Sequence, residues 1–196
     1  MRGTENAMRT LLVTPGKASA DALRAMLDPR LCPAIDVAGS ANEARQKLLG
    51  TGYDLVLINA PLADESGCRL ASDISKTTAA GVLLLVRGEL ATQVAEATGG
   101  DGVITLGKPV SRAQIAEAVS VFASVLAKLR RYEAEKRDLE RRLDELRITA
   151  RAKCLLMDQM HLSEEDAHRY LEKQAMDHRM TKLEFAKSVI RLFSEG

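Results

Sequence analysis

Short, almost wholly apolar runs recur five times in the first 110 residues, and amphipathic stretches separate them. Runs of this length without polar positions are typical of strands that are buried on both faces of a parallel sheet. The predicted strands are residues 10–14, 35–37, 54–59, 81–86 and 103–106. Each is followed by a segment with helical periodicity, which predicts alternating strands and helices.

The predicted helices of this region are residues 18–27, 41–49, 68–75 and 90–98, with another that begins after Ser111. Five strand–helix units in about a hundred residues predict an α/β fold with a flavodoxin-like, doubly wound five-stranded parallel sheet. We assign this domain to residues 10–120. The polar residues 1–9 before it are expected to be disordered.

Beyond Ser111 the chain lacks proline and glycine until Gly196, and apolar residues follow the alternating three- and four-residue spacing of a coiled coil. This dimer seam comprises Phe122, Val125, Leu129, Tyr132, Lys136, Leu139, Leu143 and Leu146. Lys136 is its single charged member, and it disfavours higher oligomers. We expect a coiled-coil linker helix over residues 121–150 that forms a homodimer, parallel or antiparallel. The alternative is a long helix that packs back on its own N-terminal domain.

The last fifty residues, 147–196, predict an all-α three-helix bundle, with a turn at residues 159–162. Two Ser/Thr-x-x-acid patterns, at Ser163 to Asp166 and at Thr181 to Glu184, predict helix starts. Apolar positions at helical spacing after each pattern supply a shared core.

The same residues resemble a known family. An Arg-Ala-Lys opening at 151–153, Leu-Ser-Glu-Glu-x-Ala at 162–167 and Leu-x-x-x-Ala-Met at 171–176 together resemble the ANTAR domain of transcription antitermination regulators. The resemblance implies binding to RNA stem-loops in nascent mRNA, with the helical linker pairing two bundles. By holding an antiterminator hairpin, such a protein prevents a competing terminator from forming.

The net charge of +1 is low for a nucleic-acid-binding protein: residues 1–110 carry −1 and residues 111–196 carry +2. RNA contacts must therefore come from a local basic face. The candidates are Arg147, Arg151, Lys153, Arg169, Lys173, His178, Arg179 and Lys182. For each, the alternative is a solvated helix face with acidic partners, such as Glu165 for Arg169. Tyr170 is expected either to stack on a base or to pack in the core.

The N-terminal domain resembles the receiver domain of response regulators, through the strand at 54–59, the loop from Pro61 to Gly67 and Gly107-Lys108-Pro109. In that family an Asp ends strand three and accepts a phosphoryl group, and an acidic pair after strand one holds Mg²⁺. The corresponding pocket here comprises Thr14, Pro15, Asn59, Val86 and Lys108. An amide cannot act as the anionic acceptor, so we expect a degenerate phospho-acceptor pocket and a pseudo-receiver.

Other polar residues near this pocket are not expected to replace what is missing. Lys108 either pairs with Asn59 or a backbone carbonyl, or it contacts a ligand. Asp54 lies at the wrong end of its strand, and Asp64 and Glu65 are expected to be solvated.

The sequence contains no catalytic constellation, so we expect no enzyme activity, no cofactor and no metal site. Three scattered cysteines and the absence of a long apolar run predict a cytoplasmic protein without a membrane partner. The leading hypothesis is an RNA-binding antitermination regulator, with a possible sensor or sequestering protein as a further partner. The alternative is a protein-interaction adaptor, or scaffold, whose pseudo-receiver docks a partner and whose bundle does not bind RNA.

Overall fold

The computed structural model of the protein describes residues 7–194 and divides into two compact units, Met1–Arg130 and Arg131–Gly196. We refer to them as the N-terminal and C-terminal units. One helix, α5 (Arg112–Met160), supplies its first turns to the N-terminal unit and the rest to the C-terminal unit.

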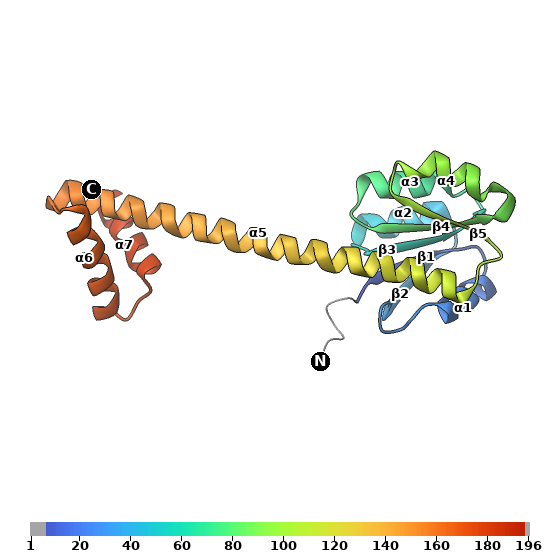
Figure 1. The fold of residues 1–196 in the computed structure, drawn as a ribbon, viewed down its shortest axis with the longest axis horizontal. Coiled ribbons are helices and arrows are strands. Elements are labelled where there is room, and N and C mark those ends of the chain that lie inside the picture. Colours follow the sequence, from blue (N-terminus) through green and yellow to red (C-terminus); the bar gives the residue numbers. More distant parts are fainter. Residues whose placement is uncertain (1–6, 195–196) are drawn as a thin grey trace. The chain divides into compact units, whose positions relative to one another are not determined.

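The N-terminal unit is built around a parallel sheet (Figure 1). Its strands β1 to β5 are Arg9–Val13, Ala34–Ala38, Leu55–Asn59, Gly81–Arg87 and Val103–Lys108. Their order is β2-β1-β3-β4-β5, and every neighbouring pair is parallel. The predicted doubly wound fold is therefore confirmed.

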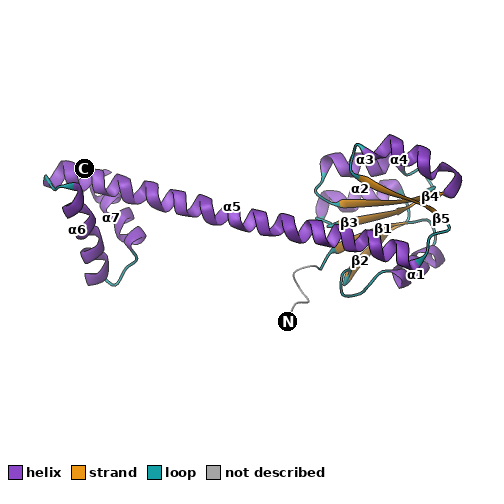
Figure 2. Cartoon of the chain, viewed as in Figure 1, coloured by secondary structure: helices purple, strands orange, loops and turns teal. Residues whose placement is uncertain are grey.

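Helices cover both faces of this sheet (Figure 2). Besides α5 they are α1 (Lys17–Met26), α2 (Ala41–Gly50), α3 (Cys68–Thr77), the 3-10 turn η1 (Gly88–Leu90) and α4 (Ala91–Gly99). Successive residues of a strand point to opposite faces. Accordingly Leu12 and Leu57 pack with α1 and the start of α5, whereas Leu11 and Val56 pack with α2 and α3.

Element ends differ from the sequence predictions by one or two residues in most cases. Of the segment predicted to be disordered, residues 1–6 lie outside the described residues. Met8 instead is buried, with 1% of its surface exposed, and Arg9 begins β1. An apolar side chain directly before a central strand has a core position available to it, which a polar flanking composition does not reveal.

The first turns of α5 belong to the core of the N-terminal unit. Ile115 and Val119 are buried there, and Phe122 is partly buried against the same cluster. A Cβ atom on Gly81 would lie 2.3 Å from the Phe122 ring, so the ring occupies the space that this glycine leaves open. The seam assignment of Phe122 is thus corrected, because the ring packs onto β4 of its own chain. The alternative expectation, a helix that packs back on its own domain, holds for this first part of α5.

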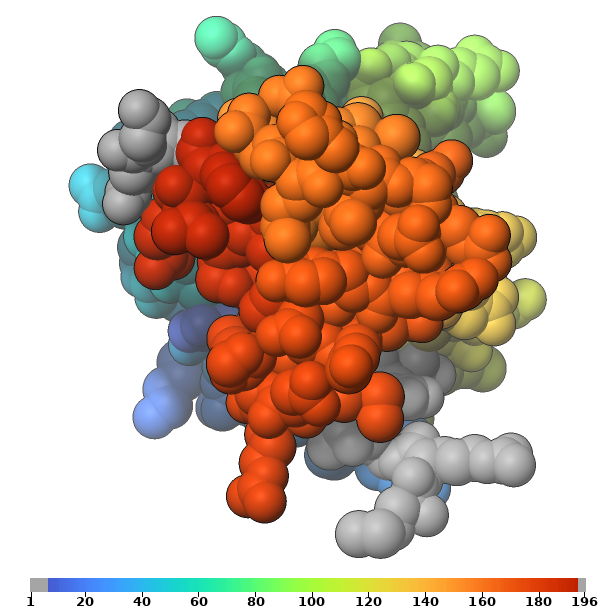
Figure 3. Space-filling view, turned by 90° about the vertical axis from the view of Figure 1, so that its left-hand side faces the viewer, coloured from blue at the N-terminus to red at the C-terminus, as the bar shows by residue number. Residues whose placement is uncertain are grey.

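The C-terminal unit comprises the rest of α5 together with α6 (Glu164–Asp177) and α7 (Lys182–Ser194). Its buried core consists of Ala152, Leu156, Ala167, Leu171, Ala186 and Val189. Figure 3 shows the end of α5, α6 and α7 in contact on the face of the bundle that is turned to the viewer. The three alanines among them, one from each helix, let the helices approach closely.

Both predicted helix caps of this unit form. The Ser163 hydroxyl accepts the Asp166 N–H at 3.1 Å and donates to its carboxylate at 2.6 Å. At α7, the Glu184 N–H donates to Thr181 Oγ1 at 3.2 Å, and the Thr181 N–H donates to the Glu184 carboxylate at 2.8 Å. These bonds satisfy N–H groups that lack intrahelical partners.

Candidate functional site

Three polar side chains meet at the carboxyl ends of β1, β3 and β5, where a receiver carries its phospho-acceptor. The Asn59 amide donates to Thr14 Oγ1 at 3.0 Å. The Lys108 ammonium donates to Asn59 Oδ1 at 3.1 Å and also to the Ala60 carbonyl. Lys108 therefore bonds to both of the acceptors that we considered for it, the Asn59 side chain and a backbone carbonyl.

The charge of this pocket is positive. Burial, and secondarily the nearby Arg87, lower the pKa of Lys108, whose hydrogen-bond acceptors here are both neutral. Within residues 7–194 Lys108 has no carboxylate partner. Pro15 follows Thr14 where the family places acidic residues, and Val86 is buried at the end of β4. The residues present thus hold one another and provide no anionic oxygen for a cation or a phosphoryl group.

The loop after β3 is fastened to α2, although Asp64 remains exposed as expected and only Glu65 is partly buried. The Asp64 carboxylate accepts the backbone N–H groups of Ala41 at 2.9 Å and Asn42 at 3.0 Å, and these bonds lower its pKa. Glu65 pairs with Arg45 at 3.1 Å. An acid beside a helix start is favoured by the helix dipole, and this long-range cap could not be predicted from local spacing.

The basic residues predicted to bind RNA all lie in the C-terminal unit, but several already have acidic partners. Lys153 pairs with Glu164 at 2.7 Å, and Lys182 pairs with Glu172 at 3.0 Å. These two lysines are mostly covered, with 20% and 34% of their side chains exposed. They tie α5 to α6 and α6 to α7.

Each of two further candidates pairs with an acidic residue of its own helix. Arg169 contacts Glu165, the partner that we considered for it, and Arg147 lies 3.6 Å from Asp144. Both pairs are strongly exposed, so they contribute little stability and a competing anion can replace them.

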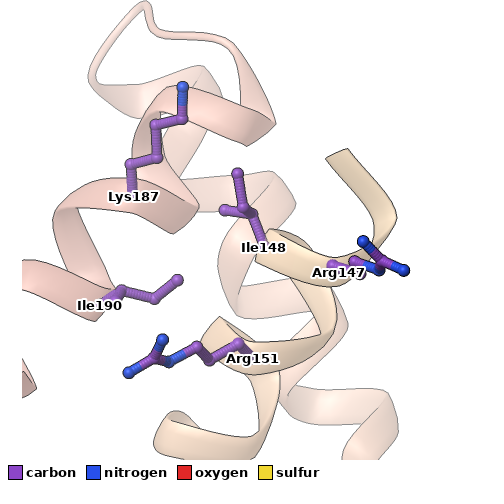
Figure 4. Close-up of a pocket in the computed structure, with 5 residues that line it drawn as sticks. All are labelled: Arg147, Ile148, Arg151, Lys187 and Ile190. Atoms are coloured by element: carbon purple, nitrogen blue, oxygen red, sulfur yellow. The ribbon is translucent and has the colours of Figure 1, made fainter. Parts of the chain in front are cut away.

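A groove between α5 and α7 brings together cations that lie far apart in the sequence (Figure 4). It is lined by Arg147, Ile148, Arg151, Lys187 and Ile190, is open to solvent and has a volume of about 340 Å³. We call it the α5–α7 groove. Of its three cations, Lys187 was not among the predicted residues. No local signal marks it, because the face that α7 turns toward α5 depends on packing between helices.

The turn between α6 and α7 carries two more predicted residues. Arg179 has a left-handed backbone with φ of 55°, and its N–H and that of Met180 bond back to the last turn of α6. This arrangement is a Schellman motif, in which glycine is usual at the position of Arg179. The His178 ring stacks on Phe185 with 5.9 Å between the ring centroids.

The remaining predicted residues separate into core and surface. Tyr170 is partly buried in the bundle core, with its ring centroid 6.4 Å from that of Phe185, so its packing role is observed. Lys173 is exposed on α6. Between residues 7 and 194 no group of three or more His, Cys, Asp or Glu side chains is arranged to hold a metal ion.

The seam residues beyond Phe122 are exposed along α5. Exposed fractions are 51% for Val125, 49% for Leu129, 60% for Leu139, 53% for Leu143 and 67% for Leu146, while Tyr132 is 52% exposed. Lys136 pairs with Glu140 at 3.7 Å on the same helix.

None of the described helices has the length and apolar character needed to cross a bilayer.

The sheet order and the helices on its two faces define a receiver fold, and solved structures agree. A CheY-like response regulator receiver domain protein from Methanospirillum hungatei has a TM-score of 0.55 at 19% identity, covering 62% of this chain and 98% of that one. A protein described as adenylate cyclase from Rhodopirellula baltica has a TM-score of 0.58 at 17% identity, covering 67% and 98%. At these identities the likeness concerns the fold alone.

Sequence comparison identifies the C-terminal unit. The ANTAR domain family matches residues 137–190. The transcriptional regulatory protein PdtaR from two strains of Mycobacterium tuberculosis is 27% identical over 153 residues, which cover 78% of this chain and 75% of the relative. These similarities support an ANTAR response regulator with a receiver fold.

Proposed function

We propose that the protein binds stem-loops in nascent mRNA through its C-terminal unit and thereby prevents a terminator hairpin from forming. The observation that carries this proposal is the α5–α7 groove, which Arg147, Arg151 and Lys187 line with no carboxylate among the lining residues. Phosphate groups dominate RNA affinity, and a local cluster of cations supplies what a net charge of +1 does not. Action on nascent transcripts places the protein in the cytoplasm.

A gel-shift titration with paired short-loop hairpins tests this function. We expect binding at low salt that weakens as salt rises, with a slope reduced by roughly one unit for each phosphate contact removed. Combined alanine substitution of Arg151, Lys153, Arg179 and Lys182 should strongly weaken binding. Arg69→Ala removes an 83%-exposed cation of the N-terminal unit, outside the seam and the bundle, and is the control.

Absence of hairpin binding at low salt would instead favour the adaptor function, in which the N-terminal unit docks a partner protein. The ion pairs of Lys153, Arg169 and Lys182 are the specific observation on that side, because they reduce the charge available to RNA.

We further propose that the receiver domain is a pseudo-receiver. The mutual hydrogen bonds of Thr14, Asn59 and Lys108 support this, since they occupy the acceptor site with a neutral amide in place of a carboxylate. Acetyl phosphate with Mg²⁺ should therefore leave the mass of the protein unchanged, and beryllofluoride should not alter its melting temperature. A receiver that keeps its acidic residues serves as the positive control, and stoichiometric phosphorylation would overturn the proposal.

A homodimer is also part of the proposal, formed by the exposed seam residues of α5. Burying a Leu side chain stabilises by about 1.5–3 kcal/mol, so several half-exposed leucines can supply a stable interface. Sedimentation should give a dimer at micromolar concentration and a monomer for Leu139→Lys with Leu143→Lys. Leu49→Lys changes a side chain that is 90% exposed outside the seam, and it should remain dimeric.

The functional division that accompanies this proposal is a pseudo-receiver over residues 10–120, a pairing helix over 121–150 and an RNA-binding bundle over 147–196. A sensor or sequestering protein acting on the dimer belongs to the same proposal.

A further inference from the structure

The α5–α7 groove has both an apolar floor and a cationic rim. A surface that binds only phosphate groups needs the cations but not the apolar floor. Its floor is apolar, formed by Ile148 and Ile190, which are partly buried and continuous with the core of the bundle. Its rim is cationic, formed by the exposed Arg147, Arg151 and Lys187 (Figure 4). Because the floor belongs to the packed core, its shape is fixed before a ligand arrives.

The rim cations are available to an anion. Arg151 and Lys187 form no ion pair within the part of the chain that the structure describes, and Arg147 has only the exposed contact with Asp144. Glu184 lies one turn before Lys187, but its carboxylate is held by the N–H and hydroxyl of Thr181. Lys187 still lies close enough to contribute to the lowered pKa of Glu184, so Glu184 and Asp144 compensate the charge of the groove in part, and Arg151 is its cation without an acidic partner among the described residues.

An apolar floor beside guanidinium groups is the chemistry that binds an unstacked nucleobase. Bases splayed out of RNA loops stack on flat or apolar side chains, and arginine contributes both stacking and phosphate pairing. A base-paired stem offers phosphates to the rim but no free base face to the floor. With about 340 Å³, the groove lies at the small end of ligand-pocket volumes, which suits a single nucleotide.

We propose that the α5–α7 groove binds one unstacked nucleotide of the hairpin loop, with its base on Ile148 and Ile190 and its flanking phosphates on Arg151 and Lys187. This inference rests on the proposed RNA-binding function and deepens it. It assigns loop recognition to one groove and leaves stem phosphates to cations elsewhere on the bundle.

The experiment uses the full chain and a set of hairpins, each with one loop position made abasic. Removal of the recognised base should weaken binding by about tenfold, the low end of the range for a stacked base. Ile190→Ala should weaken binding of the intact hairpin by a similar factor. Combining this variant with the critical abasic position should cause little further loss, because both changes remove the same contact.

Two exposed variants keep the test independent of folding. Arg151→Ala and Lys187→Ala should each weaken hairpin binding and lower the salt slope by roughly one unit. Arg191→Ala removes an exposed cation of α7 that does not line the groove, and it should bind like the unmodified protein. Thermal unfolding of every variant controls for loss of structure.

The outcomes separate the two proposals. Tight hairpin binding that no abasic loop position weakens, or that Lys187→Ala and Arg191→Ala reduce equally, would overturn the groove assignment and leave RNA binding intact. Failure of every hairpin to bind at low salt would reject the RNA function and the groove assignment together. If an acidic peptide bound and Lys187→Ala abolished that binding, the groove would be a protein-docking site.

Discussion

The guanidinium of Arg130 lies 2.7 Å from the carboxylate of Asp54, and this ion pair joins α5 to the amino edge of the sheet. The same carboxylate accepts the backbone N–H of Arg9 at 2.8 Å, while Arg130 also donates to the Ala7 carbonyl at 3.3 Å. Asp54 therefore fixes both the first strand and the last turn of α5 in the N-terminal unit. The sequence excluded Asp54 as a phospho-acceptor. Its role is structural, and it lies at the amino end of β3, opposite the end that carries Asn59.

Replacing Asp54 by Ala should destabilise the N-terminal unit by about 1.5 kcal/mol, since hydrogen bonds to charged groups are worth more than neutral ones. Arg130→Ala should cost a similar amount, and the double variant should cost less than their sum. Urea unfolding of all four proteins measures this coupling. The exposed pair of Arg87 and Glu89 is the control, where alanine substitutions should be nearly neutral.

Gly81 and Phe122 provide a test of where the first seam position packs. Gly81→Ala should destabilise by about 2 kcal/mol, because the new methyl group overlaps the Phe122 ring. In a Phe122→Ala background the same change should be nearly neutral. Sedimentation of Phe122→Ala should still give the same oligomer as the unmodified chain. A shift to monomer would return Phe122 to the dimer seam.

Arg179 is expected to trade stability for binding. A side chain with Cβ in the left-handed region costs about 1–2 kcal/mol, so Arg179→Gly should stabilise the bundle by about 1 kcal/mol. The same change should weaken hairpin binding and lower its salt slope by roughly one unit. Arg179→Ala keeps the backbone cost and loses the cation, so it should weaken binding without the gain in stability. Unchanged RNA affinity in both variants would remove Arg179 from the interface.

The C-terminal unit should lose stability in acid. The hydrogen bond from Lys182 is the main cause that lowers the pKa of Glu172, and the bond from Lys153 does the same for Glu164. The unfolded carboxyl groups titrate near 4.5, so below that pH the unfolded chain binds more protons than the folded one. The resulting stability is present above pH 4.5 and is lost as pH falls through the lower, folded pKa values.

Helical circular dichroism of the unmodified chain and of Glu172→Gln, melted between pH 3 and pH 7, measures this effect. The melting temperature of the variant should depend less on pH. Lys182→Met removes the main cause of the shift, so it should flatten the profile to a similar extent. An unchanged profile in both variants would show that this pair does not contribute to acid sensitivity.

Asn59→Asp should stabilise the N-terminal unit, by about 1 kcal/mol, because it gives Lys108 a carboxylate partner. In the unmodified protein the pKa of Lys108 is lowered, so the folded chain gains stability as pH rises from that folded pKa to the ordinary value of 10.5. The variant should lose this gain, which chemical unfolding between pH 8 and pH 11 detects. Phosphorylation should remain absent, since Thr14 and Pro15 provide no Mg²⁺ ligands.

Local patterns in the sequence were sufficient for the elements and their order. Apolar runs such as 81–86 are typical of strands covered on both faces, and the Ser163 and Thr181 caps act within four residues. The caps satisfy backbone groups within their own segment, whereas the strand over 81–86 forms its hydrogen bonds with β3 and β5. The fold class followed from them directly.

Contacts between distant segments could not be obtained in this way. Asp64 capping α2, Phe122 filling the space at Gly81 and Lys187 joining the α5–α7 groove depend on how helices rotate and approach when the cores close. The sequence determined which residues were cationic, apolar or capping, because those properties belong to each side chain. Only the tertiary structure decided which of them share a surface, because that choice is made by packing across the whole unit.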